Sequence, residues 1–210
     1  RTVTLYGGGF VGETKGNILI TALHLFANGG YEAVSMSRIS GELGITKGAL
    51  YKHYASKRDI FDNIVERMER ADAERAQECE VPEGTLAEME DAYCKATMKN
   101  LIKFSIAQFR YWTEDDFASS FRKMLTLEQY RSDENKKLYQ QYLVSGPLGY
   151  VADIFSSWNI EDSAKKAVEF YSPMFLFYGI YDGAEDKAAV CASFAAQMHS
   201  FSTKFSDIGQ

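Results

Sequence analysis

Three glycines near the start of the chain have the spacing of a motif that binds dinucleotides. Gly7, Gly9 and Gly12 follow a short strand-like run in the pattern G-x-G-x-x-G. Such glycines let the backbone approach a pyrophosphate at a helix N-terminus, but only within a β-α-β unit. No alternation of strands and helices follows Val34, so we favour a flexible glycine-rich arm over residues 1–13. A dinucleotide-binding oxidoreductase built on this motif is kept as an alternative.

The histidines and cysteines, which could supply metal ligands or nucleophiles, are few and scattered. His24 and His199 lie near opposite ends of the chain, and Cys191 precedes His199 by eight residues. That spacing is too long for a chelating pair of neighbours on one helix. The three cysteines form no C-x-x-C pair, as expected for reduced thiols in a cytoplasmic protein. We therefore predict no metal, no cofactor and no catalytic residue, and we expect that the chain is not an enzyme.

Polar and basic residues gather instead around two short helical segments between residues 35 and 57. Ser35 and Thr46 are good N-caps for helices over 36–43 and 47–53, and Gly44 ends the first of them. Two short helices joined by a glycine turn are typical of a helix-turn-helix, whose second helix enters the major groove of DNA. The hydroxyls of Ser35 and Thr46 could bond phosphates or cap helices, and the two roles are compatible.

Four short motifs stand at fixed places in this region: Leu25-Phe26 before Gly30-Tyr31, Leu43-Gly44, Gly48-Ala-Leu-Tyr-x-His-Tyr54, and Ser56-Lys-x-Asp59. Together they make residues 17–61 resemble, without a gap, the DNA-binding domain of the tetracycline-repressor (TetR) family. The resemblance implies an all-helical protein that binds a palindromic DNA operator as a homodimer and responds to a small-molecule effector.

The resemblance also implies roles for individual residues. Tyr51, His53 and Lys57 match positions that clamp the DNA backbone, as a phenol, an imidazole and a cation can do. Other positions match residues that approach the bases. The full set of candidate DNA contacts is Ser35, Ser37, Arg38, Thr46, Lys47, Gly48, Tyr51, His53 and Lys57. Because Ser37 and Gly48 are small or neutral, a helical binding module without DNA binding is a second alternative.

Helical periodicity continues beyond this region to the end of the chain. Ser56 and Asp59 form a capping box for a fourth helix that runs to about Cys79. Further helices are predicted over residues 85–112, 115–131, 134–157, 162–182 and 185–206, with kinks or local breaks at Pro147 and Pro173. The fold class is thus all-α with about nine helices. We assign residues 14–58 to the helix-turn-helix domain and residues 59–210 to an effector-binding and dimerisation domain.

Aromatic residues are concentrated between Phe104 and Tyr181 and are interleaved with polar residues. A mostly apolar cavity with a few polar groups is typical of small-molecule sites, and the family resemblance places an effector pocket in this part of the chain. A small apolar or aromatic effector is expected. The candidate lining residues are Phe104, Gln108, Trp112, Phe121, Leu125, Phe155, Phe175 and Tyr178.

Small residues dominate the last predicted helix and would allow a close helix-helix approach. With the aromatic helix before it, this helix could form a four-helix bundle between two subunits. The candidate interface residues are Tyr171, Phe175, Tyr178, Ala188, Ala192, Ala195, Ala196 and His199.

The charge of the chain is divided between two segments. The net charge is −6, which taken alone argues against a nucleic-acid partner. Residues 1–58 nevertheless carry a net +4, and the remaining 152 residues carry −10. No apolar run is long enough for a membrane span, and the first residues lack the pattern of a secretory signal, so a cytoplasmic location is expected. The combined prediction is a ligand-responsive DNA-binding regulator of transcription, with repression as the expected mode.

Overall fold

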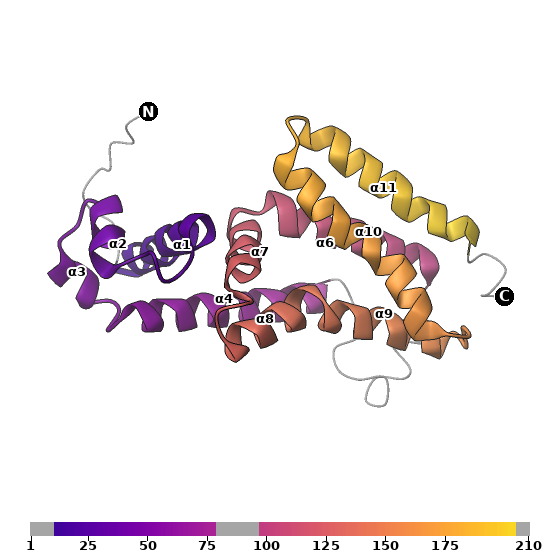
Figure 1. The fold of residues 1–210 in the computed structure, drawn as a ribbon, viewed down its shortest axis with the longest axis horizontal. Helices are drawn as coiled ribbons and strands as arrows, with labels where there is room; N and C mark the ends of the chain where they lie inside the picture. Colours follow the sequence, from indigo (N-terminus) through magenta and orange to yellow (C-terminus); the bar gives the residue numbers. More distant parts are fainter. Residues whose placement is uncertain (1–10, 79–96, 205–210) are drawn as a thin grey trace. The chain divides into compact units, whose positions relative to one another are not determined.

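The structure, a computed structural model, describes residues 11–78 and 97–204 of the chain (Figure 1). These residues form helices α1–α4 and α6–α11, and there is no strand among them. They belong to two compact units, residues 1–70 and 71–210. The predicted all-α fold is confirmed, and the described residues do not provide the β-α-β unit that a dinucleotide-binding turn requires.

The first unit has a small apolar core between α1 (Val11–Gly29), α2 (Met36–Glu42), α3 (Lys47–Tyr51) and the start of α4 (Lys57–Glu78). On α1 the spacing of Ile18, Ala22 and Phe26 places all three on one face, and all three are fully buried. Ile39 of α2 and Leu50 of α3 are also fully buried. Each short helix is therefore held through an apolar side chain, and its polar face stays exposed.

Two glycines fix the turns of this unit. Gly30, after the last residue of α1, has φ +80°, and Gly44, between α2 and α3, has φ +65°. Both values lie in the left-handed region that side chains with a Cβ rarely adopt. Across the second turn Gly44 N donates to Gly41 O (3.1 Å) and Ile45 N to Ser40 O (3.0 Å). The turn predicted at Gly44 is thus formed, and it sets the direction in which α3 leaves α2.

The start of α1 differs from the sequence-based expectation. The helix begins at Val11, so residues 11–13 are helical and do not belong to an arm. Gly12 is tolerated there because the first turn of a helix makes few backbone bonds that a glycine could weaken. Residues 1–10, with Gly7 and Gly9, lie outside the described part of the chain. At the other side the first compact unit extends to Arg70, within α4, while the domain boundary expected after residue 58 stays a prediction.

The second unit contains the six remaining described helices. They are α6 (Met98–Glu114), α7 (Asp116–Glu128), α8 (Asp133–Leu143), α9 (Ser145–Ser157), α10 (Ser163–Gly183) and α11 (Lys187–Lys204). α10 packs against α9, α11 and α6, and Figure 1 shows α10 and α11 side by side. At the centre the ring of Phe109 stacks on Tyr178 (5.6 Å between centroids) and Phe194 (4.2 Å). The aromatic residues of this part of the chain thus largely build its core.

The segment predicted as one helix over residues 134–157 is two helices. The chain turns at Val144 (φ −130°, ψ −89°), between α8 and α9. A Cβ added at Gly146 would lie 1.9 Å from the carbonyl oxygen of Gln141, so this close approach of the backbone requires glycine. Pro147 stands at the third position of α9, where its missing N–H costs no helical bond. The kink or local break expected at Pro147 is therefore present as a full break at Val144, three residues before the proline, and residues 134–157 form two helices.

At Pro173, in contrast, α10 continues without a break. Proline lacks the N–H that would bond the carbonyl four residues earlier, which here belongs to Glu169. The hydroxyl of Ser172 donates to that carbonyl oxygen at 3.4 Å. This side-chain bond offsets part of the loss and helps α10 to continue. No helix in the described ranges is long and apolar enough to span a lipid bilayer.

Candidate nucleic-acid interface and ligand cavity

The hydroxyls of Ser35 and Thr46 cap the two short helices of the first unit. Ser35 Oγ accepts from Arg38 N (3.2 Å), and Thr46 Oγ1 accepts from Ala49 N (3.1 Å). Of the two roles left open for these residues, capping is therefore present. A capping oxygen still carries its own hydrogen, so both hydroxyls can also donate to an acceptor beside the helix.

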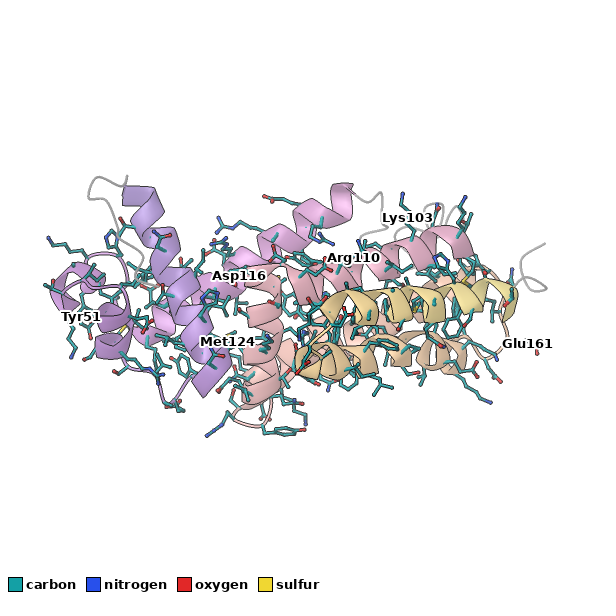
Figure 2. All side chains as sticks on the ribbon, turned by 90° about the horizontal axis from the view of Figure 1, so that it is seen from above. Tyr51, Lys103, Arg110, Asp116, Met124 and Glu161 are labelled. Atoms are coloured by element: carbon teal, nitrogen blue, oxygen red, sulfur yellow. The ribbon has the colours of Figure 1, made fainter. Side chains whose placement is uncertain are left out.

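The outward face of α3 presents the side chains predicted to meet DNA. Leu50 is fully buried, whereas Lys47 and Gly48 are exposed and Tyr51 is 51% exposed (Figure 2). A Cβ added at Gly48 would meet only Thr46 Oγ1, at 3.9 Å. Nothing in the protein itself therefore demands glycine at residue 48. Its exposed backbone is consistent with close approach to a partner.

The helix α2, which precedes α3 in the helix-turn-helix, also has exposed side chains. Ser37 and Arg38 are both exposed, and Ser37 O accepts from Ser40 Oγ (3.1 Å). His53, which follows α3, is half-buried. The predicted contacts on α2 and α3 thus include small, cationic and aromatic groups at the surface, the types that bond phosphate and base edges.

Lys57, predicted to contact the DNA backbone, makes several contacts within the protein itself. Its Nζ donates to Tyr31 O (2.8 Å) and lies 4.0 Å from the centroid of the Tyr31 ring. Glu32 Oε2 is 4.0 Å away. The ammonium thus joins the start of α4 to the turn after α1. An ammonium has three donors, so a phosphate contact is still open to Lys57 in addition to these bonds.

Tyr54 is a structural residue of this unit that the sequence reasoning did not single out. It is buried, and its hydroxyl donates to Lys15 O (3.2 Å), which joins the end of the helix-turn-helix to α1. Burial, assisted by the nearby charge of Asp59, raises the pKa of the Tyr54 phenol to about 12. Its position in the motif Gly48–Tyr54 was the available signal.

The second unit contains a cavity of about 250 Å³ whose wall is mostly apolar. Four of the predicted lining residues, Phe104, Gln108, Trp112 and Tyr178, do line it. The other four predicted residues do not. Phe121, Leu125 and Phe155 are fully buried in the core, because their helical spacing turns them toward neighbouring helices. Phe175 is 47% exposed on the outer side of α10.

Much of the cavity wall comes from residues that the sequence reasoning missed. The turn between α8 and α9 brings Gln141 and Tyr142 together with Gly146, Pro147, Tyr150 and Val151. Residues 134–157 were predicted as one helix with a kink or local break at Pro147, which does not specify the sharp turn that brings these residues together. Asp72 of α4 and Tyr171 and Met174 of α10 also contribute. Gly146-Pro147 in a helical pattern was the available signal of a turn.

The polar groups of the cavity wall are few. Gln108 Oε1 is buried and has no hydrogen-bond partner among the described residues. The Tyr171 hydroxyl donates to Leu143 O (2.7 Å), and burial raises the pKa of this phenol. Burial also raises the pKa of Tyr178 well above its ordinary value. Both phenols are therefore neutral at physiological pH.

A buried arginine links three helices beside this cavity. Arg122 of α7 donates from Nε to Trp112 O (3.0 Å) and from its two terminal nitrogens to the carboxylate of Asp182 (3.0 and 2.8 Å). Its guanidinium also lies 4.8 Å from the centroid of the Tyr178 ring. Trp112 and Tyr178 line the cavity, so this cluster holds two of its walls in place. The sequence offered no signal for it.

The predicted dimer residues divide into an inward and an outward group. Tyr171 and Tyr178 are buried within the unit, so their side chains are corrected to core and cavity residues. Phe175, Ala188, Ala192, Ala196 and His199 are exposed, and Ala195 is half-buried. Three further apolar side chains, Val168, Leu176 and Ile180, are exposed on α10. We call the exposed residues of α10 and α11 the α10–α11 face.

Metal-ligating side chains do not converge anywhere in the part of the chain that the structure describes, since no group of three or more His, Cys, Asp or Glu could hold an ion. Cys191 is buried and its thiol lies 3.4 Å from Glu114 Oε1. Cys79 and Cys94 lie outside the described residues.

Comparison with known proteins agrees with this geometry. Residues 18–64 match the family model described as bacterial regulatory proteins, tetR family. This part of the chain is therefore a tetR-family helix-turn-helix domain. The match covers the whole helix-turn-helix, from within α1 to the start of α4.

Curated relatives match over a stretch of similar length. The transcriptional regulator AcrR of Shigella flexneri is 40% identical over 57 residues, which are 27% of this chain and 26% of AcrR. The transcriptional activator FasR of Mycolicibacterium smegmatis is 34% identical over 55 residues, which are 26% of this chain and 25% of FasR. The chain thus matches about a quarter of the length of these relatives.

The fold likeness extends further. A transcriptional regulator of the TerR/AcrR family from Aquifex aeolicus VF5 matches with a TM-score of 0.62 over 90% of this chain and 99% of that one, at 14% identity. The second unit therefore shares the helical fold of such regulators, although little of its sequence is shared.

Proposed function

We propose that this chain regulates transcription by binding a DNA operator as a homodimer and by changing its DNA affinity when a small molecule enters the cavity of the second unit. The observation that carries the proposal is the tetR-family helix-turn-helix whose second helix, α3, presents Lys47, Gly48 and Tyr51 to solvent. A DNA-binding role implies a cytoplasmic location.

The proposed DNA contacts follow from the exposed face of the first unit. Lys47 and Arg38 supply charge, Tyr51 and the capping hydroxyls supply hydrogen bonds to phosphate, and Gly48 allows the backbone of α3 to lie close to the bases. Phosphate contacts position the protein, and the few base contacts specify the sequence. The residues expected to face the bases are small and can make few base contacts. Much of the DNA affinity is therefore expected to come from the cationic side chains and from the shape match between α3 and the major groove.

The proposed dimer uses the α10–α11 face. Phe175, Leu176 and Ile180 expose large apolar side chains along one helix, and alanines on α11 leave room for a close approach. Apolar patches of this kind are costly in water and are typical of subunit contacts. Two identical faces can bury each other around a two-fold axis. A dimer then presents two α3 helices to the half-sites of a palindrome.

The proposed switch involves α4. Asp72 of α4 lines the cavity, and the same helix begins at the helix-turn-helix with Lys57. A ligand that favours one position of Asp72 would favour one position of α4 and thereby one spacing of the two α3 helices. Ligand and operator then affect each other's affinity reciprocally. We propose repression, relieved by the ligand, as the mode.

The experiment that tests the proposal is selection of bound duplexes from a random DNA pool by the purified chain. The expected result is enrichment of one palindromic sequence, with half-sites separated by about one helical turn or a multiple of it. A helical binding module without DNA binding predicts no enrichment, and that outcome would overturn the proposal.

A further inference from the structure

We propose that Ser105 and Tyr178 bind a carbonyl oxygen of the ligand, and that the ligand of the cavity is a small ring compound with a ketone, ester or amide group. The inference rests on the proposed function of this cavity as the effector site. It follows from three features that the two residues share. Both are buried, both line the cavity, and neither hydroxyl has a hydrogen-bond partner among the described residues.

The burial of these two hydroxyls makes their lack of a protein partner informative. Ser105 of α6 is 5% exposed and Tyr178 of α10 is 6% exposed. A buried hydroxyl is normally hydrogen-bonded, because an unpaired one loses the bond that it makes in water. Thr113, which is also buried on α6, follows this rule, since its Oγ1 donates to Phe109 O at 2.7 Å. Ser105 and Tyr178 therefore need a partner from the contents of the cavity.

The two residues lie close to each other where α6 packs against α10. Ser105 and Phe109 are four residues apart and therefore share one face of α6. The ring of Phe109 stacks on the ring of Tyr178, with 5.6 Å between centroids and 10° between planes. Tyr178 thus lies on the residue one helical turn after Ser105, so both hydroxyls can reach the same group of a ligand.

The ring of Tyr178 is held in place from both sides. Besides the stacking on Phe109, the guanidinium of Arg122 lies 4.8 Å from its centroid, and Arg122 is itself fixed by two bonds to Asp182. A side chain that is already ordered loses little freedom when it binds a ligand. Burial raises the pKa of the Tyr178 phenol well above its ordinary value, so the hydroxyl keeps its proton and can donate at neutral pH.

Two hydroxyl donors fit one carbonyl oxygen. A carbonyl oxygen has two lone pairs and accepts two hydrogen bonds, whereas it brings no hydrogen that needs an acceptor of its own. Gln108, three residues after Ser105, also lines the cavity, and its amide has two N–H donors. The donors on this side of the cavity thus favour an oxygen acceptor in the ligand.

Two charged side chains of α4 define the rival to this inference. Asp72, in the cavity wall, is exposed and already interacts within the protein. Arg75 is not part of the wall, but it lies one helical turn after Asp72, and its Nε is buried without a hydrogen-bond partner among the described residues. Its guanidinium lies 3.7 Å from the centroid of Tyr111. A carboxylate ligand bound by Arg75 is therefore the alternative that the experiment must distinguish.

The rest of the wall fits a ring. The Phe104 and Tyr150 rings lie 5.9 Å apart and the Trp112 and Tyr142 rings 6.2 Å apart between centroids, so an apolar ring can pack against aromatic surface. A dry cavity of about 150 Å³ can hold benzene, and this cavity has about 250 Å³. It therefore fits one ring with a short arm that carries the carbonyl group.

The test compares two probes of the same shape, acetophenone and α-methylstyrene, in which a CH₂ group replaces the carbonyl oxygen. Calorimetry measures the binding of each probe to the full chain. α-Methylstyrene leaves water more readily, so the measured quantity is the ratio of the two affinities and its change in variants, and not the order of the two affinities.

Two variants remove the proposed donors one at a time. Tyr178→Phe and Ser105→Ala are each expected to weaken acetophenone about tenfold, which corresponds to about 1.4 kcal/mol, because one bond to its oxygen is lost. Neither variant should weaken α-methylstyrene, which makes no such bond, whereas damage to the cavity would weaken both probes. The matched controls are Tyr139→Phe and Ser120→Ala, at a buried phenol and a buried serine outside the cavity wall, and they should leave the ratio unchanged.

Benzoate tests the rival site. If benzoate binds more tightly than acetophenone, and Arg75→Gln weakens it while Ser105→Ala and Tyr178→Phe do not, recognition lies at Arg75 and the inference is overturned.

The outcomes distinguish this inference from the proposed function. If the affinity ratio stays the same in both Tyr178→Phe and Ser105→Ala, the carbonyl assignment is overturned while the cavity remains a ligand site. If neither acetophenone nor α-methylstyrene binds, the assignment is overturned together with the effector role of the cavity. Loss of the DNA-binding proposal would be seen separately, in the selection from random duplexes.

Discussion

The residues of the helix-turn-helix fall into two groups. Some stabilise the fold through hydrogen bonds, and others are exposed and are proposed to contact DNA. Ser35 and Thr46 cap helices, and Lys57 is bonded to the Tyr31 carbonyl. Lys47 and Gly48 make no contact that the fold of the first unit requires. The sequence alone placed all five in one motif but could not separate these roles, because the Lys57–Tyr31 bond joins residues 26 positions apart.

Lys47 and Lys57 should therefore respond differently to removal of the side chain. Lys47→Ala is expected to weaken binding to all duplexes and to lower the salt dependence of log K by about one unit of slope, without a change in stability. Lys57→Ala is expected to lower the free energy of unfolding by about 1–2 kcal/mol, because the carbonyl of Tyr31 loses its charged donor. DNA titrations at several salt concentrations and urea unfolding measure the two effects.

The same titrations test the phosphate contact predicted for Lys57. An unchanged salt slope in Lys57→Ala excludes that contact. An unchanged free energy of unfolding would contradict the structural role instead.

Gly48 is expected to matter for DNA and not for the fold. Gly48→Ala should leave stability unchanged or raise it by up to about 1 kcal/mol, since alanine favours a helix and the added Cβ has room. DNA affinity should fall, because the Cβ meets the groove. Gly149→Ala, at an exposed glycine of α9 with space around it, is the matched control and should keep DNA affinity. Unchanged affinity in Gly48→Ala would contradict the close approach of α3.

At the scale of helices, much of the arrangement could be predicted from caps and apolar spacing. The turns at Gly30 and Gly44 and the bounds of α2 and α3 follow from local residues whose effect is felt within one turn of helix. A kink or local break was predicted at Pro147, but its position at Val144 and the sharpness of the turn depend on a close approach of Gly146 to Gln141, which apolar periodicity does not report. For the same reason only four of the eight predicted lining residues line the cavity. The part of the wall that was not predicted is formed by residues of the α8–α9 turn.

The bond from Tyr171 of α10 to α8 makes a prediction about alkaline stability. Burial raises the pKa of this phenol, so the folded chain keeps its proton at a pH where the unfolded chain has released it. The contribution of Tyr171 to stability is thus complete below about pH 10 and is lost as the pH rises further. Urea unfolding from pH 8 to pH 11 should show this loss.

Tyr171→Phe should be less stable at pH 8, because Leu143 O loses its donor, and should lose less stability between pH 8 and pH 11. Tyr130→Phe, at a phenol that is 88% exposed, serves as the control and should behave like the unsubstituted chain. An identical alkaline loss in Tyr171→Phe would show that other groups cause it.

At the scale of the whole molecule, the proposed function combines the division of charge with a proposed dimer interface on the α10–α11 face. Residues 1–58 carry a net +4 and the rest −10, so the chain can meet DNA with its helix-turn-helix while the acidic remainder avoids phosphate. The overall charge of −6 concealed this because it sums two opposite segments. The proposed dimer would present two such basic segments to the operator.

The proposed dimer uses exposed apolar residues, so a single charge introduced among them should weaken it. Leu176 is 63% exposed on α10, and Leu176→Asp is expected to shift the chain to monomers by placing a carboxylate in the buried interface. Leu127→Asp, at a leucine that is 46% exposed on α7, is the matched control. Sedimentation velocity over a range of concentrations measures the change, and a stable dimer in Leu176→Asp would place the interface elsewhere.

The most direct test of the account is the stoichiometry and affinity of the chain on a palindromic duplex selected from a random pool. The account predicts that two chains bind each duplex, at least about a thousandfold more tightly than a scrambled duplex at the same salt concentration. Equal affinity for the selected and the scrambled duplex would contradict it, because a tetR-family helix-turn-helix that reads no sequence cannot direct the chain to an operator.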